Sequence, residues 1–140
     1  MSNSEQIAII GAGLMGNGIA AVFAAKGYSV TIYDPFAQAL EAAPGRVAGV
    51  LKDLEWDAEA LKRVRVEADL TKAVADADFV TEAALEKLPI KQDLFVQLAA
   101  ATKSTCVLAS NTSVIPITDI GAKLNDQDAA RMLGTHWWNP

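Results

Sequence analysis

Short apolar runs alternate with longer amphipathic stretches along the whole chain. The runs have the length of strands, and they are apolar throughout rather than at alternate positions, which is typical of strands buried on both faces of a sheet. Strands are predicted at 6–10, 29–33, 64–67, 79–82, 106–109 and 132–135.

The stretches between these strands have the apolar spacing of helices that pack by one face. Helices are predicted at 14–26, 36–54, 70–75, 90–101 and 117–124. Pro44-Gly45 is expected to interrupt or divide the second helix. Because strands and helices alternate, we expect parallel strands joined by right-handed crossovers. The predicted fold is therefore α/β, a doubly wound, mostly parallel sheet with helices on both faces.

Size and composition favour one globular domain over residues 1–140, with 51% hydrophobic and 21% charged residues. The net charge of −5 argues against a nucleic-acid or membrane partner. Without a recognisable signal peptide, we expect a cytoplasmic protein. The lone Cys106 is expected to be a small buried hydrophobe, and no metal site is predicted. Because the chain stops at Pro140 directly after a predicted strand, we expect it to be truncated.

A glycine motif, Gly11-Ala12-Gly13-Leu14-Met15-Gly16, follows the first strand and opens the first helix. This is the context that a dinucleotide-binding G-x-G-x-x-G requires. Gly11 permits a tight turn, Gly13 lets the backbone approach a pyrophosphate, and Gly16 lets the helix pack near the strand. The helix N-terminus offers free N–H groups to the phosphates. The alternative is a glycine-rich turn without a ligand.

Asp34 ends the second strand, close to the spacing of about 20 residues at which such motifs carry an acidic residue. Its carboxylate is expected to accept hydrogen bonds from ribose hydroxyls and to repel a 2′-phosphate. Pro35 and Phe36 follow, rather than an arginine. The predicted cofactor is therefore NAD rather than NADP, although Asp34 could also cap the next helix.

Two polar segments follow the last two strands, at the edge where ligands bind in such sheets. Ser110-Asn111-Thr112-Ser113 comes after the fifth strand, and His136, the only histidine, comes after the sixth. A histidine can remove a hydroxyl proton near neutral pH, and a serine can hold the same oxygen. These are the parts needed to oxidise an alcohol, although a lone histidine is often structural.

With these motifs the sequence resembles, over essentially its whole length, the NAD-binding N-terminal domain of the L-3-hydroxyacyl-CoA dehydrogenase family, a Rossmann-type domain. The resemblance rests on the glycine motif, Glu82-Ala83 through Glu86 and Lys91, Ser110 to Ser113, and His136 to Pro140. It implies that His136 is the general base and that Ser113 bonds the substrate oxygen and contacts the cofactor. It also implies that Glu86, Lys91 and Asn139 contact the nicotinamide half of NAD, whereas Ser110 and Asn111 are expected to shape the loop.

The implied reaction is oxidation of (S)-3-hydroxyacyl-CoA to 3-oxoacyl-CoA with NAD, as in fatty acid β-oxidation. The resemblance further implies a homodimer formed through a helical C-terminal domain, whose absence would leave this chain alone with little turnover. Trp137-Trp138 replaces the family's frequent Phe-Phe, and segment 36–65 lacks a recognisable coenzyme A site. Two alternatives therefore stay open: a dehydrogenase of free hydroxy acids such as L-gulonate or carnitine, and a non-catalytic NAD-binding module.

Overall fold

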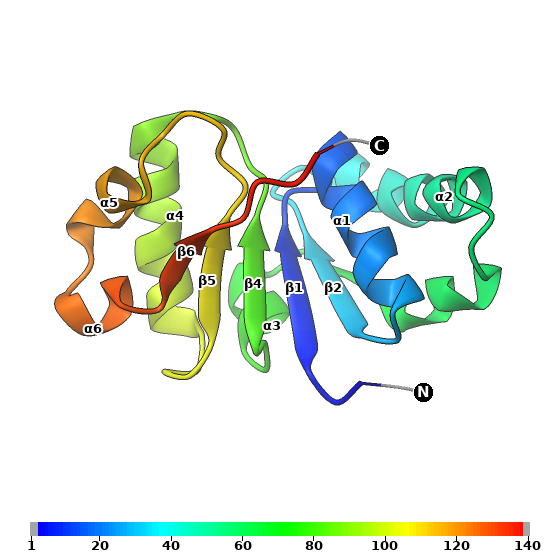
Figure 1. The fold of residues 1–140 in the computed structure, drawn as a ribbon, viewed down its shortest axis with the longest axis horizontal. Helices are drawn as coiled ribbons and strands as arrows, with labels where there is room; N and C mark the ends of the chain where they lie inside the picture. The colour runs from blue at the N-terminus through cyan, green and yellow to red at the C-terminus, as the bar shows by residue number, and fades with distance from the viewer. Residues whose placement is uncertain (1–2, 139–140) are drawn as a thin grey trace.

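The computed structural model describes residues 3–138, which form one parallel sheet with helices on both faces (Figure 1). The strand order is β3-β2-β1-β4-β5-β6, so the chain starts in the middle, moves outward, and returns to build the other half. The strands are β1 (Gln6–Ile10), β2 (Ser29–Tyr33), β3 (Val64–Glu67), β4 (Phe79–Glu82), β5 (Val107–Ser110) and β6 (Met132–Gly134). This topology confirms the predicted α/β doubly wound fold and makes the sheet parallel throughout.

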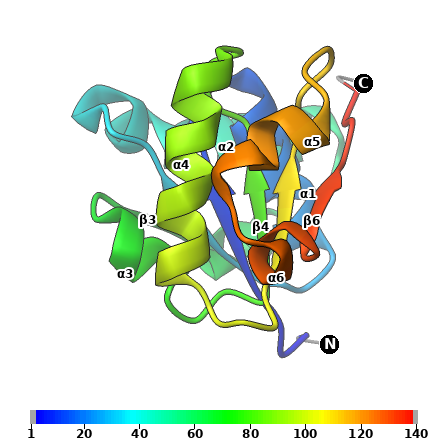
Figure 2. The same cartoon turned by 90° about the vertical axis from the view of Figure 1, so that its left-hand side faces the viewer.

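The helices divide between the two faces of the sheet. They are α1 (Leu14–Ala25), α2 (Ala37–Asp53), α3 (Leu70–Val74), α4 (Leu88–Ala101), α5 (Ile117–Ile120) and α6 (Asp126–Ala129), with 3₁₀ turns at Ala58–Arg63 and Gly121–Lys123. The first two helices share one buried cluster, whereas α3, α4 and α5 contribute to a second. Figure 2 turns α4, α5 and α6 toward the viewer.

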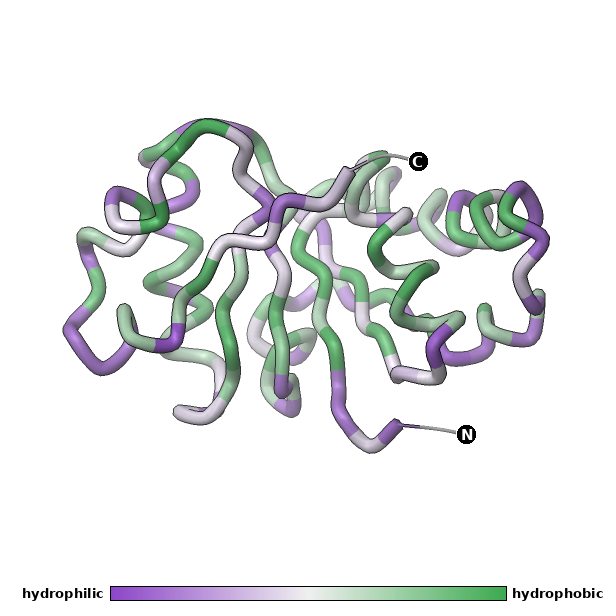
Figure 3. Tube along the Cα trace, in the orientation of Figure 1, coloured by the Kyte–Doolittle hydropathy of each residue, from purple (hydrophilic) through white to green (hydrophobic). Residues whose placement is uncertain are grey.

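Alternate residues of the central strand β1 supply the two cores. Ile7 and Ile9 of β1 belong to the cluster under α1 and α2, and Ala8 and Ile10 belong to the opposite one. The central part of the sheet is therefore mostly apolar, which Figure 3 shows as hydrophobic colour there. Both faces of the central strands are covered, as the continuous apolar runs predicted, whereas the edge strands β3 and β6 are partly exposed.

The prediction that Pro44-Gly45 divides the second helix was wrong, because α2 is continuous. Its buried residues are Leu40, Ala43, Val47 and Leu51. They form one apolar stripe along the helix, and packing of that stripe holds the helix together on both sides of the proline. Pro44 itself is exposed, so its ring points away from the core.

Other differences are smaller. The 3₁₀ turn at Ala58–Arg63 and α6 are both too short to show a helical period, and each begins with a side-chain cap, from Asp57 and Asn125. β5 starts one residue later than predicted, so Cys106 precedes it and is fully buried, as expected. Within residues 3–138, no helix is long and apolar enough to cross a membrane.

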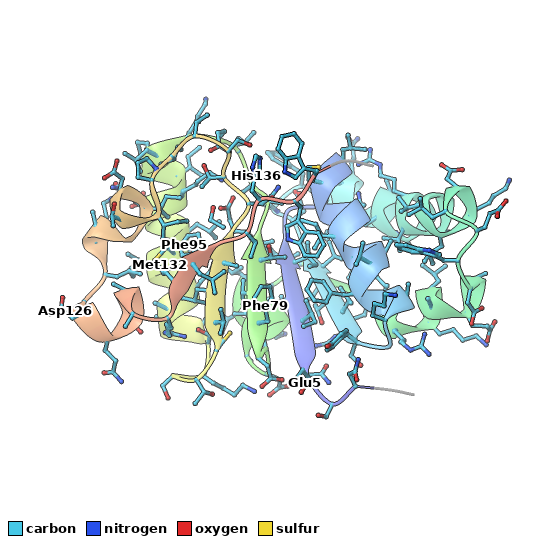
Figure 4. All side chains as sticks on the ribbon, viewed as in Figure 1. Glu5, Phe79, Phe95, Asp126, Met132 and His136 are labelled. Carbon is cyan, nitrogen blue, oxygen red and sulfur yellow. The ribbon has the colours of Figure 1, made fainter. Side chains whose placement is uncertain are left out.

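The strand register aligns the ends of all six strands in one row, with Tyr33 of β2 also paired with Glu67 of β3. Ile10 pairs with Tyr33 and Glu82, Glu82 pairs with Ser110, and Ser110 pairs with Gly134. The residues that follow this row therefore lie together at the carboxyl edge of the sheet, where doubly wound proteins bind ligands. Figure 4 shows His136 at this edge and Glu5 at the opposite one.

Candidate functional site

The three glycines of the motif after β1 have different surroundings. Gly11 has a φ of +115°, and a Cβ there would lie 2.6 Å from the Ala83 carbonyl oxygen. A Cβ on Gly16 would lie 1.8 Å from the Gly11 oxygen. A Cβ on Gly13 would meet no protein atom within 4 Å. Packing within the described protein therefore explains Gly11 and Gly16, whereas Gly13 leaves space that a ligand can occupy.

The N-terminus of α1 is built to receive an anion. Gly13 is its N-cap, and among the described residues no side chain caps it. The N–H groups and dipole of the first turn are thus available to a diphosphate. Asn17 Nδ2 donates to the carbonyls of Ala12 and Gly13 at 2.8 Å, and Arg46 Nη1 donates to Ala12 at 3.1 Å. Sequence reasoning missed these two supports, because neither belongs to the motif.

Asp34 adjoins the glycine loop, as predicted for a residue that reads the ribose. Its Oδ2 accepts from the Ala12 N–H and its Oδ1 accepts from the Phe36 N–H, both at 2.9 Å. Phe36, rather than Asp34, occupies the N-cap position of α2, so the alternative that Asp34 caps this helix was wrong. The carboxylate is instead fixed beside the loop.

A cavity of about 560 Å³ opens beside Asp34 and Gly13. Tyr33, Phe36 and Leu94 are among its lining residues. Burial, followed by the negative charges of Asp34 and Asp69, raises the pKa of Tyr33. Its phenol therefore stays protonated at neutral pH. The glycine loop, the uncapped helix and this cavity fit a dinucleotide.

Ser113 and His136, predicted from different parts of the chain, meet at the same edge. Ser113 Oγ lies 3.0 Å from His136 Nε2. Both side chains are exposed and line a cavity of about 410 Å³ together with Thr135 and Ile117. The indole of Trp138 lies beside the imidazole, with ring centroids 5.0 Å apart. Two groups able to hold and deprotonate a hydroxyl therefore face open space.

Glu86 and Lys91 lie close together but in different surroundings. Glu86 Oε1 accepts from the Thr112 hydroxyl, which brings it to the loop that carries Ser113. Lys91 is only 1% exposed, and its Nζ lies 2.5 Å from Glu82 Oε1 and 3.7 Å from Glu86 Oε2. Contact of either side chain with NAD stays a prediction. Asn139 lies outside the described residues.

Glu82 was not predicted to be a site residue, and Ser110 was expected only to shape the loop. Ser110 Oγ donates to Glu82 Oε2 at 2.5 Å, and both side chains are fully buried. The signal was present in the sequence. Glu82 ends an apolar strand that is buried on both faces, and a buried carboxylate needs hydrogen-bond or charged partners. The sequence could therefore have predicted a buried polar network at this residue.

Six parallel strands in this order, a glycine loop opening α1, and an acidic residue after β2 together define a dinucleotide-binding domain of the Rossmann class. The Ser113–His136 pair adds a hydroxyl and an imidazole 3.0 Å apart at the same edge of the sheet. Residues 6–140 match the family model described as "3-hydroxyacyl-CoA dehydrogenase, NAD binding domain". The chain belongs to this family, and its cofactor is NAD.

Individual relatives agree. The chain is 38% identical to a probable 3-hydroxyacyl-CoA dehydrogenase of Caenorhabditis elegans, over 100% of this chain and 49% of the relative. It is 39% identical to an L-carnitine dehydrogenase of Streptomyces griseus, over 97% of this chain and 41% of the relative. The solved 3-hydroxybutyryl-CoA dehydrogenase of Escherichia coli superposes with a TM-score of 0.89 at 39% identity, over 99% of this chain and 30% of that one. The chain therefore spans less than half the length of these relatives.

Proposed function

We propose that the protein oxidises (S)-3-hydroxyacyl-CoA to 3-oxoacyl-CoA with NAD, as in fatty acid β-oxidation. The observation that carries this proposal is the 3.0 Å contact between Ser113 Oγ and His136 Nε2 at the carboxyl edge of the sheet. Family membership and the glycine loop support it. Glu86 joins the same region through the Thr112 hydroxyl.

In this proposal the substrate hydroxyl contacts both Ser113 Oγ and His136 Nε2 from the open side of the pair. Ser113 donates a hydrogen bond to its oxygen, and neutral His136 accepts its proton at Nε2. Bound NAD supplies the acceptor for the hydride that leaves the carbinol carbon, so the alcohol becomes a ketone. The Gly13 backbone and the first turn of α1 hold the diphosphate, and Asp34 holds the ribose. The protein mainly aligns the reacting groups and stabilises moving charge.

Replacing His136 by Ala in the full-length protein tests the base assignment. Loss of a general base should lower kcat by about 10²- to 10⁴-fold, measured as NADH oxidation with acetoacetyl-CoA. The Kd of NADH, measured by fluorescence, should stay within about threefold, because the glycine loop is unchanged. A variant that turns over like the native protein while binding NADH would show that His136 is not the base. A native protein that binds NADH but reduces no 3-oxo compound would favour the non-catalytic module.

A second candidate substrate is a free hydroxy acid that carries a cationic group. Carnitine, the substrate named for the Streptomyces griseus relative, is such a compound. The observation that favours it is a cavity of about 330 Å³ between α1 and α2, reached by Trp137 and Trp138. Among residues 3–138, Asp53 is the one charged residue that lines it. Aromatic faces and a carboxylate bind quaternary ammonium groups.

Parallel assays separate the two substrates. The full-length protein would be given L-carnitine or L-gulonate with NAD in one series, and 3-hydroxybutyryl-CoA with NAD in the other. A preference for the thioester of at least about tenfold in kcat/KM is expected, and the opposite preference would replace the first proposal by the second. Homodimer formation through a helical C-terminal domain, a cytoplasmic location and the lack of nucleic-acid or membrane partners stay predictions.

A further inference from the structure

Five side chains form a closed ring of polar contacts that includes the loop carrying Ser113. They are Glu82, Glu86, Lys91, Ser110 and Thr112. Glu82 accepts from Lys91 Nζ and from Ser110 Oγ, each at 2.5 Å. Thr112 donates its backbone N–H to Ser110 Oγ at 3.3 Å and its hydroxyl to Glu86. Glu86 Oε2 closes the ring 3.7 Å from Lys91 Nζ.

The charged pair at the centre of this ring is almost without solvent contact. Glu82 is 0% exposed and Lys91 is 1% exposed. Desolvating two charges offsets much of their attraction, so a buried ion pair is a weak source of stability compared with apolar packing. Such a pair instead favours one geometry of its surroundings. Removing one partner leaves an uncompensated buried charge, which is strongly destabilising. The ring therefore has one favoured arrangement.

The ring is also connected to the segment that carries His136. The backbone N–H of Asn111 donates to the Glu82 carbonyl at 2.8 Å, and Asn111 Oδ1 accepts from the Trp137 N–H at 2.8 Å. The backbone N–H of Thr135 donates to the Ser110 carbonyl at 2.9 Å. His136 is thus bracketed by two bonds to the loop that Glu82 organises.

We propose that Glu82 is a positioning residue of the dehydrogenase site. Through Lys91 and Ser110 it holds the loop of residues 110–113, and with it Glu86, in the arrangement in which Ser113 meets His136. This inference rests on the proposed dehydrogenase function. It concerns Glu82 and Ser110, which lie at the ends of β4 and β5 and position Ser113 and His136 without contacting the substrate.

Thr112 offers the gentlest test, because Thr112→Val changes a hydroxyl to a methyl group at a half-buried position. It removes the bond to Glu86 and opens the ring, and it also removes the acceptor of the Ile115 N–H, whereas Thr112→Ser keeps the hydroxyl and both bonds. In the full-length protein, kcat for Thr112→Val should fall by about 10- to 100-fold, as expected for a small misplacement of reacting groups. The substrate KM should change by less than about threefold. Thr112→Ser should stay within about threefold of the native kcat.

Glu82 is tested directly by Glu82→Gln and by the double variant Glu82→Gln/Lys91→Met. The single change leaves the buried Lys91 ammonium with only the more distant, partly exposed Glu86 carboxylate, 3.7 Å away, as a counter-charge, so the Tm should fall. The double change removes both charges, and Tm should recover toward the native value while kcat at saturating NADH stays at least about tenfold low. The Kd of NADH should stay within about threefold, which separates the loss of positioning from the loss of a Lys91 contact with NAD. A purely structural role for the pair would restore kcat together with Tm.

His136 is the only histidine in the sequence, so its ring resonances report on the site without any turnover. Thr112→Val and Glu82→Gln should shift the imidazole ¹H and ¹⁵N signals, and Thr112→Ser should leave them near native. Native kcat and native His136 signals in both altered variants would overturn the inference. Absence of turnover in the native protein would instead count against the proposed function, and the ring signals would still decide the role of Glu82.

Discussion

At the scale of single residues, the site depends on what surrounds each side chain rather than on residue type. The three motif glycines look alike in the sequence, yet Gly11 and Gly16 are enclosed by protein and Gly13 faces open space. The serines after β5 differ in the same way. Ser110 is buried against a carboxylate, whereas Ser113 is exposed beside the histidine. Substituting residues of one type at different positions should therefore give different results.

Alanine substitutions at Gly13, Gly16 and Gly18 test this difference. Gly13→Ala should lose no more than about 1 kcal/mol of stability, but the added methyl group should weaken NADH binding about tenfold or more. Gly16→Ala should lose about 3 kcal/mol or more, because its Cβ would overlap the Gly11 carbonyl. Gly18→Ala, where a Cβ meets no protein atom within 4 Å, should gain about 0.5–1 kcal/mol.

Urea unfolding and NADH fluorescence measure the two effects separately. Unchanged NADH affinity in Gly13→Ala would show that the diphosphate lies elsewhere. Native stability in Gly16→Ala would show that the loop can move away from α1.

At the scale of elements, tertiary packing decides where local preferences conflict. α2 continues through Pro44 because its buried stripe packs along its whole length. The proline nevertheless lacks an N–H for the helical ladder. Because packing of the stripe offsets this defect, removing the defect should increase stability.

Pro44→Ala should therefore raise the free energy of unfolding by about 2 kcal/mol. An interior proline destabilises a helix by about 3 kcal/mol, and its restriction of the unfolded chain returns up to about 1 kcal/mol. Gln38→Ala, at an exposed position of the same helix, is the control and should change little. A destabilised Pro44→Ala, seen by chemical denaturation, would mean that the proline shapes α2 in a way the packing requires.

The starts of β1 and β4 are joined by one carboxylate. Asp78 accepts from Lys103 Nζ at 2.6 Å and from the Gln6 N–H at 2.8 Å. The side-chain hydrogen bond from Lys103, followed by the backbone bond from Gln6, lowers the pKa of Asp78. The folded state therefore gains stability above the usual Asp range of about 3.9. This gain is lost as the pH falls through the lower folded-state pKa.

The stability gap between the native protein and Asp78→Asn should accordingly be largest near neutral pH and close as the pH falls below about 3.9. The pKa of Lys103 is raised, mainly by the side-chain hydrogen bond to Asp78. The gap should therefore also close at strongly alkaline pH. Thermal unfolding across a pH series measures it, with the exposed Asp53→Asn as control. A gap that does not vary with pH would rule out the ionic role of Asp78.

At the scale of the whole molecule, distant segments are joined at the carboxyl edge. The segment after β6 crosses the ends of the central strands toward α1 (Figure 1). Trp137 packs there against Phe23, with ring centroids 5.7 Å apart. The two buried clusters share the same sheet, so neither half of the site can form without the common strands.

Cys106 offers a test of this shared core. It is fully buried, and burial raises the pKa of its thiol. Because the thiolate is the reactive form, an aromatic disulfide reagent should react with it only when the core opens. The extent of modification should follow urea unfolding with the same midpoint as circular dichroism. Rapid reaction in native buffer, at the rate of free cysteine, would show that the second cluster opens independently.

The sequence alone determined the alternation of six strands with the longer helices, the doubly wound class and the dinucleotide loop. These follow from apolar periodicity and from glycine spacing, which act over a few neighbouring residues. Only the tertiary structure decided that α2 passes through Pro44, that Lys91 is buried against Glu82, and that Ser113 reaches His136. Each of these depends on which atoms from distant segments fill the surrounding space, and no local pattern records that.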